Sequence, residues 1–230
     1  MSTIAENIAK VGERIRAAAQ ASGRDLDHIG LLAVSKTKPA AAVREAYAAG
    51  IRDFGENYLQ EALEKQAELS ELPLIWHFIG PIQSNKTKPI AEHFAWVHSV
   101  DRLKIAQRLS EQRPSHLPPL NICLQVNVSA EDSKSGCAPA ELAALAQTVN
   151  QLPNLRLRGL MAIPEPTDDV AAQRAAFARL RELRDGLALP LDTLSMGMSH
   201  DLDAAIAEGA TWVRIGTALF GARDYGRAQN

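Results

Sequence analysis

Short runs of β-branched and apolar residues alternate with longer helix-forming segments over almost the whole chain. The short runs have the length and composition of strands, whereas the longer segments carry apolar stripes at helical spacing. The eight expected strands are Gly30–Thr37, Ile51–Asn57, Leu74–Gly80, Ala95–Asp101, Asn121–Ser129, Leu155–Ile163, Thr193–Ser199 and Trp212–Phe220. The expected helices are Ile4–Gln20, Ala40–Ala49, Tyr58–Leu69, Asn85–His93, Leu103–Glu111, Pro139–Gln151, Ala171–Leu187 and Asp201–Ala207.

This alternation predicts a parallel sheet, because each connection between parallel strands carries a helix over the sheet. Eight such units preceded by an extra helix favour closure into one α/β domain over residues 1–230, a (β/α)₈ TIM barrel. An open doubly wound sheet is the alternative. Such a sheet usually has a glycine-rich turn after its first strand, whereas the turn here reads Ser35-Lys36-Thr37-Lys38-Pro39.

Charge and apolar patterning exclude several functional classes. With 25 basic and 27 acidic residues, the net charge of −2 gives no field that would attract nucleic acid or an anionic membrane. We find neither a membrane-length apolar run nor a signal peptide and expect a cytoplasmic protein. Cys123 and Cys137 are too few for a disulfide scaffold, and no residue set has the spacing of metal ligands.

Lys36 is the strongest single candidate for chemistry. It follows Leu31–Ser35, a run that we expect to be buried in the sheet, and it lies at the barrel end that carries active sites. Partial desolvation there favours the neutral amine, which forms imines with carbonyl compounds. The alternative is that Lys36 only marks the exit of the strand into water.

The last predicted strand carries the second candidate group. Gly216 and Thr217 offer backbone amides and a hydroxyl to a phosphate, which barrels often bind after strands seven and eight, where Ser199 also lies. Arg214 shares a strand face with Gly216 by alternation, although an ion pair with a neighbouring strand is equally compatible. His77 is a weaker acid–base candidate, since a lone strand histidine is more often a hydrogen-bonded core residue.

Seven motifs, in order along the chain, resemble the pyridoxal phosphate homeostasis proteins, which are related to the N-terminal barrel domain of alanine racemase. The motifs are Ala33–Pro39, Phe54–Glu61, Trp76–Lys86, Ser133–Gly136, Arg158–Pro164, Leu194–Ser199 and Val213–Gly221. The resemblance implies that Lys36 forms a Schiff base with pyridoxal 5′-phosphate (PLP) and that Arg214 faces the pyridine nitrogen. By the same resemblance, the phosphate cradle is Ser199, Gly216 and Thr217, and the remaining cofactor-pocket residues are Asn57, His77 and Met161.

An arginine at the ring nitrogen bears on function. Arginine stays cationic and only donates hydrogen bonds, so it holds that nitrogen unprotonated and weakens the cofactor as an electron sink. Racemases with this barrel use a second base from an additional domain, which we do not find in this chain. We therefore expect a monomeric PLP carrier that stores the cofactor and delivers it to PLP-dependent apoenzymes, without strong catalysis.

Two enzyme functions remain as alternatives. The first is a PLP-dependent amino-acid racemase or decarboxylase, which needs a second acid–base residue opposite Lys36, and His77 is the only nominee. The second is a cofactor-free barrel enzyme that uses Lys36 on a sugar phosphate, and it predicts a colourless protein.

Overall fold

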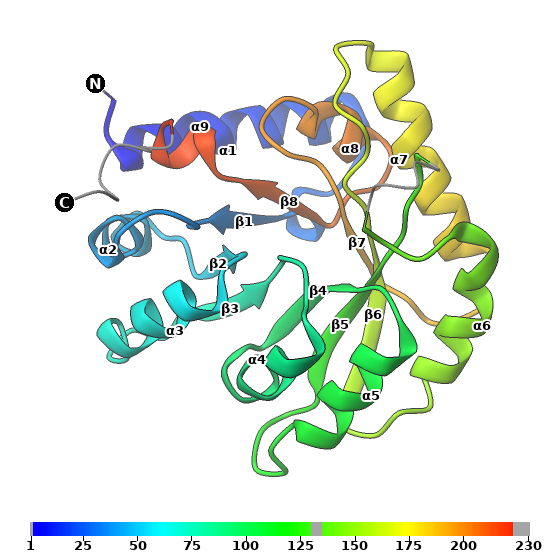
Figure 1. Cartoon of the computed structure of the whole chain (residues 1–230). Helices are drawn as coiled ribbons and strands as arrows, with labels where there is room; N and C mark the ends of the chain where they lie inside the picture. Colours follow the sequence, from blue (N-terminus) through cyan, green and yellow to red (C-terminus); the bar gives the residue numbers. More distant parts are fainter. Residues whose placement is uncertain (1, 130–134, 223–230) are drawn as a thin grey trace.

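The computed structural model describes residues 2–129 and 135–222, and within them eight parallel strands close into a barrel (Figure 1). The strands are β1 (Gly30–Val34), β2 (Asp53–Glu56), β3 (Ile75–Phe78), β4 (Trp96–Val100), β5 (Leu120–Gln125), β6 (Leu155–Met161), β7 (Thr193–Ser195) and β8 (Trp212–Ile215). Each strand pairs with its neighbours in chain order, and β8 returns to pair with β1. The predicted (β/α)₈ barrel is confirmed, and the open sheet is excluded.

Helices surround the barrel in the predicted order. They are α1 (Ile4–Ala21), α2 (Ala40–Ala48), α3 (Leu59–Glu68), α4 (Thr87–His93), α5 (Leu103–Gln112), α6 (Pro139–Val149), α7 (Val170–Asp185), α8 (Leu202–Ala207) and α9 (Thr217–Phe220), with 3₁₀ turns η1 (Leu26–His28) and η2 (Ser84–Lys86). Pro89 lies in the first turn of α4, and Pro139 opens α6, where a missing N–H costs nothing. The extra N-terminal helix expected over Ile4–Gln20 is α1.

The last strand departs from the sequence prediction. The run Trp212–Phe220 was expected to be one strand, but β8 ends at Ile215 and Thr217–Phe220 forms the helix α9. Periodicity does not distinguish a short buried strand from one turn of buried helix. The pairing of β8 with β1 ends at Ala33 and Ile215, and the Gly216 carbonyl instead accepts from the Leu219 and Phe220 amides of α9.

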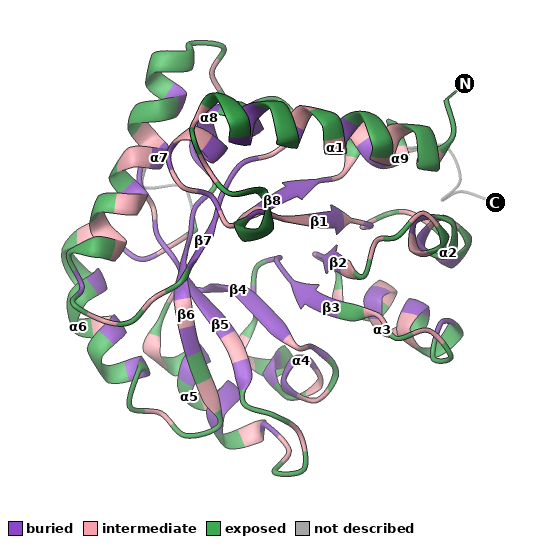
Figure 2. Ribbon diagram, turned by 180° about the vertical axis from the view of Figure 1, so that it is seen from behind, coloured by how far each residue is buried: buried purple, intermediate pink, exposed green. Residues whose placement is uncertain are grey.

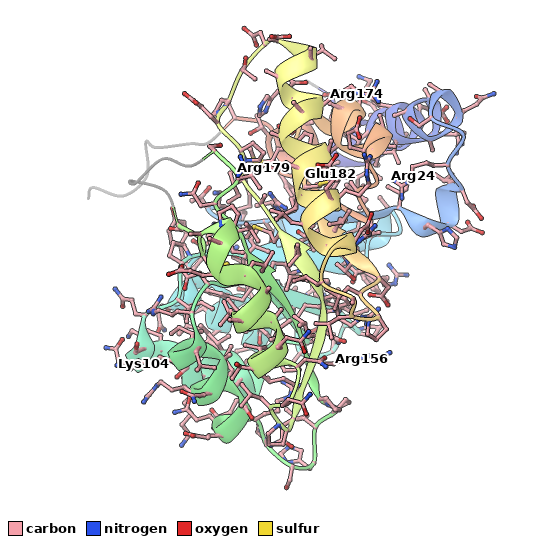
Figure 3. The ribbon with its side chains drawn as sticks, turned by 90° about the vertical axis from the view of Figure 1, so that its right-hand side faces the viewer. Arg24, Lys104, Arg156, Arg174, Arg179 and Glu182 are labelled. Carbon is pink, nitrogen blue, oxygen red and sulfur yellow. The ribbon has the colours of Figure 1, made fainter. Side chains whose placement is uncertain are left out.

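The core lies between the barrel and its helices. Strand residues are buried along most of their length, and exposed residues gather on the outward faces of the helices (Figure 2). Phe54, Phe94 and Phe177 are the largest fully buried side chains. On the side shown in Figure 3, α7 carries charged residues of both signs, and Arg174 hydrogen-bonds Glu208 at 2.7 Å.

No helix within residues 2–129 and 135–222 combines the length and apolar character needed to cross a bilayer.

Candidate functional site

A cavity of about 280 Å³ opens at the carboxyl ends of the barrel strands. Its lining residues are Val34, Lys36, Lys38, Asn57, Ile79, Ile163, Met198, Ser199, His200, Arg214, Gly216, Thr217 and Gly221. Six of the eight residues predicted for the cofactor site therefore meet in one place, although they come from distant parts of the chain. This is the barrel end at which active sites are built.

Lys36 lies on a tight turn between β1 and α2 and is half-buried. The next residue, Thr37, has a φ of 62°, in the left-handed region that side chains with a Cβ seldom occupy. Its backbone N–H donates a hydrogen bond of 2.6 Å to Glu61 Oε1 on α3. The strained turn is therefore held from the neighbouring helix, and it presents Lys36 to the cavity.

A buried ion network supports the same turn. Lys65 Nζ donates 2.6 Å hydrogen bonds to the Ser35 carbonyl and to Glu56 Oε1, and it also pairs with Glu61. Ser35 Oγ donates to the same Glu56 oxygen at 2.7 Å. Burial raises the pKa of Glu56, and the Lys65 charge opposes this shift. Lys65 was not among the residues predicted from the sequence, although its i,i+4 spacing from Glu61 on a helix was a usable signal.

Ser199, Gly216 and Thr217 form the proposed phosphate end of the cavity. Gly216 caps α9 and Thr217 begins it, and the Gly216 carbonyl accepts from the Leu219 and Phe220 amides. The amides of Thr217 and Ala218 precede these bonds and have no acceptor within the helix. A Cβ on Gly216 would lie 3.3 Å from the Val34 carbonyl oxygen, so glycine lets β8 and β1 approach closely here. A short extra helix after strand eight is a recurring barrel phosphate site.

The N-terminal helix α1 contacts both α9 and the loop that carries Ser199. In Figures 1 and 2, α1 runs beside α8 and α9. Asn7 Nδ2 donates to the Leu219 carbonyl at 2.9 Å, and Arg14 donates to the Ser199 carbonyl at 2.5 Å. The helix was predicted from the sequence, whereas its contacts with the site were not, because both contacts join residues from opposite ends of the chain.

Arg214 lies at the inner wall of the cavity and is only 4% exposed. Its guanidinium donates to Ser195 Oγ at 2.9 Å and to the Ala162 carbonyl at 3.0 Å. Among the described residues these acceptors are neutral, in contrast to the ion pair considered from the sequence. Burial lowers the pKa of Arg214 to about 10, a shift that the nearby Asp201 opposes, so the group remains cationic at neutral pH.

Asn57 lies in the cavity wall with its side-chain oxygen buried. No hydrogen-bond partner for that oxygen exists among the described residues. A Cβ on Gly80 would collide with the Asn57 backbone oxygen, and Ser99 Oγ fixes the Gly80 carbonyl with a 2.5 Å hydrogen bond. Close packing thus holds Asn57 in place and leaves its amide available to a ligand.

His77 and Met161 are not among the residues that line the cavity. His77 is fully buried, with its ring nitrogens 2.9 Å from His98 and from Asp53, as in the alternative of a hydrogen-bonded core histidine. Met161 packs with Trp96 and Cys123. Within the seven motifs, residues 133 and 134 lie outside the described part of the chain.

Comparison with known proteins identifies the family. The family model for the alanine racemase N-terminal domain matches residues 3–224. The chain is 83% identical over 226 residues to the pyridoxal phosphate homeostasis protein of Pseudomonas aeruginosa, with 98% of each chain covered. The chain belongs to the pyridoxal phosphate homeostasis protein family.

Two further proteins are similar to this chain over their whole length. The Escherichia coli K12 pyridoxal phosphate homeostasis protein is 56% identical over 237 residues, covering 99% of this chain and all of that one. PipY of Synechococcus elongatus PCC7942, solved with PLP bound, has a TM-score of 0.84 and 44% identity, covering 95% of this chain and all of that chain. The resemblance expected from the seven motifs is therefore confirmed.

Proposed function

We propose that this protein binds PLP in the cavity as a Schiff base on Lys36 and acts in cytoplasmic PLP homeostasis, storing the cofactor and delivering it to apoenzymes. The observation that carries the proposal is that Lys36, Arg214 and Thr217 line one cavity. The names of the relatives, and the PLP bound to PipY, support the same choice of ligand.

The cavity residues fit the functional groups of PLP. The Lys36 amine can form an imine with the aldehyde of PLP. The start of α9 and the Ser199 loop can bind its phosphate. Arg214 has N–H groups beyond the two that its protein acceptors use, and an aromatic nitrogen with a lone pair accepts from such a donor. Asn57 adds a buried amide oxygen that awaits a donor.

The same residues favour a carrier over a strong catalyst. A cationic donor at the ring nitrogen keeps that nitrogen unprotonated, which weakens the electron withdrawal that PLP enzymes use. His77, the nominee for a second base, is bonded to His98 and Asp53 inside the barrel. The cavity does include His200, but this residue is adjacent to Ser199 on the loop assigned to the phosphate.

The attachment site is tested by reduction and peptide mapping. Purified protein is reconstituted with PLP, its visible absorbance is recorded, and borohydride then fixes the imine before mass spectrometry. We expect the label on Lys36 and its loss in Lys36→Ala. Lys38→Ala is the matched control, because Lys38 lines the same cavity but bonds the Ala222 carbonyl. A label on another lysine, or an unchanged imine in Lys36→Ala, would refute the proposal.

The carrier function is tested by transfer. PLP-loaded protein is mixed with a PLP-dependent apoenzyme whose activity reports cofactor arrival, and free PLP is trapped by a competing amine. We expect transfer together with negligible α-proton exchange on added amino acids. Rapid exchange or decarboxylation would favour the racemase or decarboxylase alternative, and a protein that binds no PLP would favour the sugar-phosphate enzyme.

A further inference from the structure

A continuous line of hydrogen bonds crosses the barrel interior from the cavity toward the opposite end. It begins at Arg214, whose NH1 lies 2.9 Å from Ser195 Oγ, and Ser195 Oγ lies 2.7 Å from His98 Nδ1. His98 Nε2 is 2.9 Å from His77 Nδ1, and His77 Nε2 is 2.9 Å from Asp53 Oδ1. Five strands contribute one residue each, so only barrel closure assembles this line.

The two ends of the line fix the direction of every bond in it. Arginine only donates, and an ionised carboxylate only accepts. Because Asp53 accepts, His77 donates from Nε2, and the Nδ1 of the neutral ring then accepts from His98 Nε2. The Nδ1 of neutral His98 in turn lacks a proton, so Ser195 Oγ donates to it while accepting from Arg214.

The surroundings keep both histidines neutral. His77 and His98 are fully buried, and burial lowers the pKa of each, while Asp53 opposes the shift at His77. His77 also stacks on Trp96 and meets Trp212 edge-on, and neither indole accepts a proton in the line. Two titratable groups act on Arg214: Asp201, whose Oδ1 accepts from the Met198 amide, and the Cys123 thiol, which burial keeps protonated and therefore neutral.

This direction suits a buried cation without a direct counter-ion. Each neutral imidazole turns its lone pair toward Arg214 and its N–H toward Asp53, so the dipoles along the line stabilise both end charges. Aligned hydrogen bonds in a low-dielectric interior strengthen one another. Asp53 therefore acts as the remote counter-charge of Arg214, through three neutral side chains.

We propose that Asp53, His77, His98 and Ser195 form a one-directional hydrogen-bond chain that positions Arg214 for the ring nitrogen of PLP, with Asp53 as the positioning residue that sets the direction. The cofactor end of this inference rests on the proposed function, whereas the direction of the chain is a property of the protein alone. Without the carboxylate, nothing forces the proton onto Nε2 of either histidine. Ser195 would then be free to turn away from His98, and Arg214 would lose a fixed acceptor.

The direction is tested in the cofactor-free protein by ¹⁵N NMR of histidine side chains, assigned with His77→Gln and His98→Gln. We expect both rings neutral and protonated only on Nε2. Finding either ring protonated on Nδ1 in the wild-type protein would overturn the proposal, whether or not PLP binds.

The role of Asp53 is tested by Asp53→Asn, because an amide can either accept from or donate to His77 and so removes the directional constraint. We expect Nδ1-protonated histidine to appear, the absorbance of bound PLP to shift, and PLP affinity to fall about fivefold, as for the loss of one hydrogen bond. Asp53→Glu should restore the wild-type tautomers and absorbance. Asp27→Asn, near the same end of the barrel, is the control and should change neither.

The outcomes separate the two proposals. If Asp53→Asn lowers only thermal stability and leaves tautomers and absorbance as in wild type, Asp53 is merely structural and the inference fails. If borohydride labels no Lys36 in the wild-type protein, the proposed function fails, and the cofactor end of the chain's role fails with it. The tautomers measured without cofactor still decide the direction.

Discussion

Lys65 Nζ on α3 lies 2.6 Å from the carbonyl oxygen of Ser35, the residue immediately before Lys36. The two residues are thirty positions apart, and the lysine side chain is only 6% exposed. The position of the Lys36 turn therefore depends on a buried cation from another helix. That cation is compensated by Glu56 and Glu61.

Replacing Lys65 with methionine should destabilise the protein strongly. The substitution leaves Glu56 buried without a cation, a loss that typically costs about 3–5 kcal/mol. Urea unfolding followed by circular dichroism measures this cost. The double variant Lys65→Met/Glu56→Gln should recover part of the lost stability, because Glu56 is then no longer a buried carboxylate without its cation. A single variant as stable as wild type would contradict the assignment of this ion pair.

Arg14→Ala should weaken PLP binding without affecting the attachment lysine. Arg14 holds the Ser199 carbonyl and pairs with Asp203, so its removal frees the loop assigned to the phosphate. We expect an affinity loss of about five- to thirtyfold, which corresponds to the roughly 1–2 kcal/mol that one or two ordinary hydrogen bonds contribute. Arg16→Ala is the control, since Arg16 lies on the same helix, is exposed and pairs locally with Glu13. Equal affinities for the two variants would disprove the anchoring role of α1.

Arg214→Glu and Thr217→Ala should affect bound PLP in different ways. A carboxylate in place of Arg214 should protonate the ring nitrogen, alter the absorbance of the bound cofactor and allow slow side reactions on added amino acids. Thr217→Ala should loosen the cofactor and leave its absorbance unchanged. Absorbance spectra and PLP titrations distinguish the two effects. If only Thr217→Ala changed the spectrum, the placement of the pyridine ring at Arg214 would be wrong.

The buried histidines should make the protein acid-sensitive. Burial lowers the pKa of His77 and places that of His98 well below its ordinary value of 6.5. Above pH 6.5 the two histidines are unprotonated in both the native and the unfolded state, so they cause no loss of stability. Below pH 6.5 the histidines bind protons in the unfolded chain, whereas their lowered pKa keeps them unprotonated in the native protein. The free energy of unfolding should therefore fall as pH drops, approaching about 1.4 kcal/mol per pH unit for each histidine.

Urea unfolding between pH 5 and pH 7.5 measures that slope. His98→Gln should reduce it, because one buried ring is gone. His116→Gln should leave it unchanged, since His116 is exposed. A slope independent of His98 would show that carboxyl groups, rather than this histidine, cause the acid sensitivity.

The sequence alone was sufficient for the fold and for most of the candidate site. Alternating strand and helix patterns required parallel crossovers, and eight repeats closed the barrel. Because the carboxyl ends of all eight strands meet at one face, Lys36, Asn57, Ser199 and Thr217 could be assigned to one cavity without any contact information. The prediction of the last strand was wrong over Thr217–Phe220. This segment has the apolar composition of a strand but forms the helix α9.

Tertiary structure decided what sequence spacing cannot encode. Whether His77 faces the cavity or the interior depends on the register of β3 against β2 and β4, which places its ring between Asp53 and His98. Whether Arg214 meets a carboxylate depends likewise on which side chains neighbouring strands bring to its level. The sequence thus determined which residues lie at the barrel mouth, through periodicities that act over a few residues. Barrel closure determined their partners, because hydrogen bonds between side chains from different strands exist only when the register of every strand is fixed.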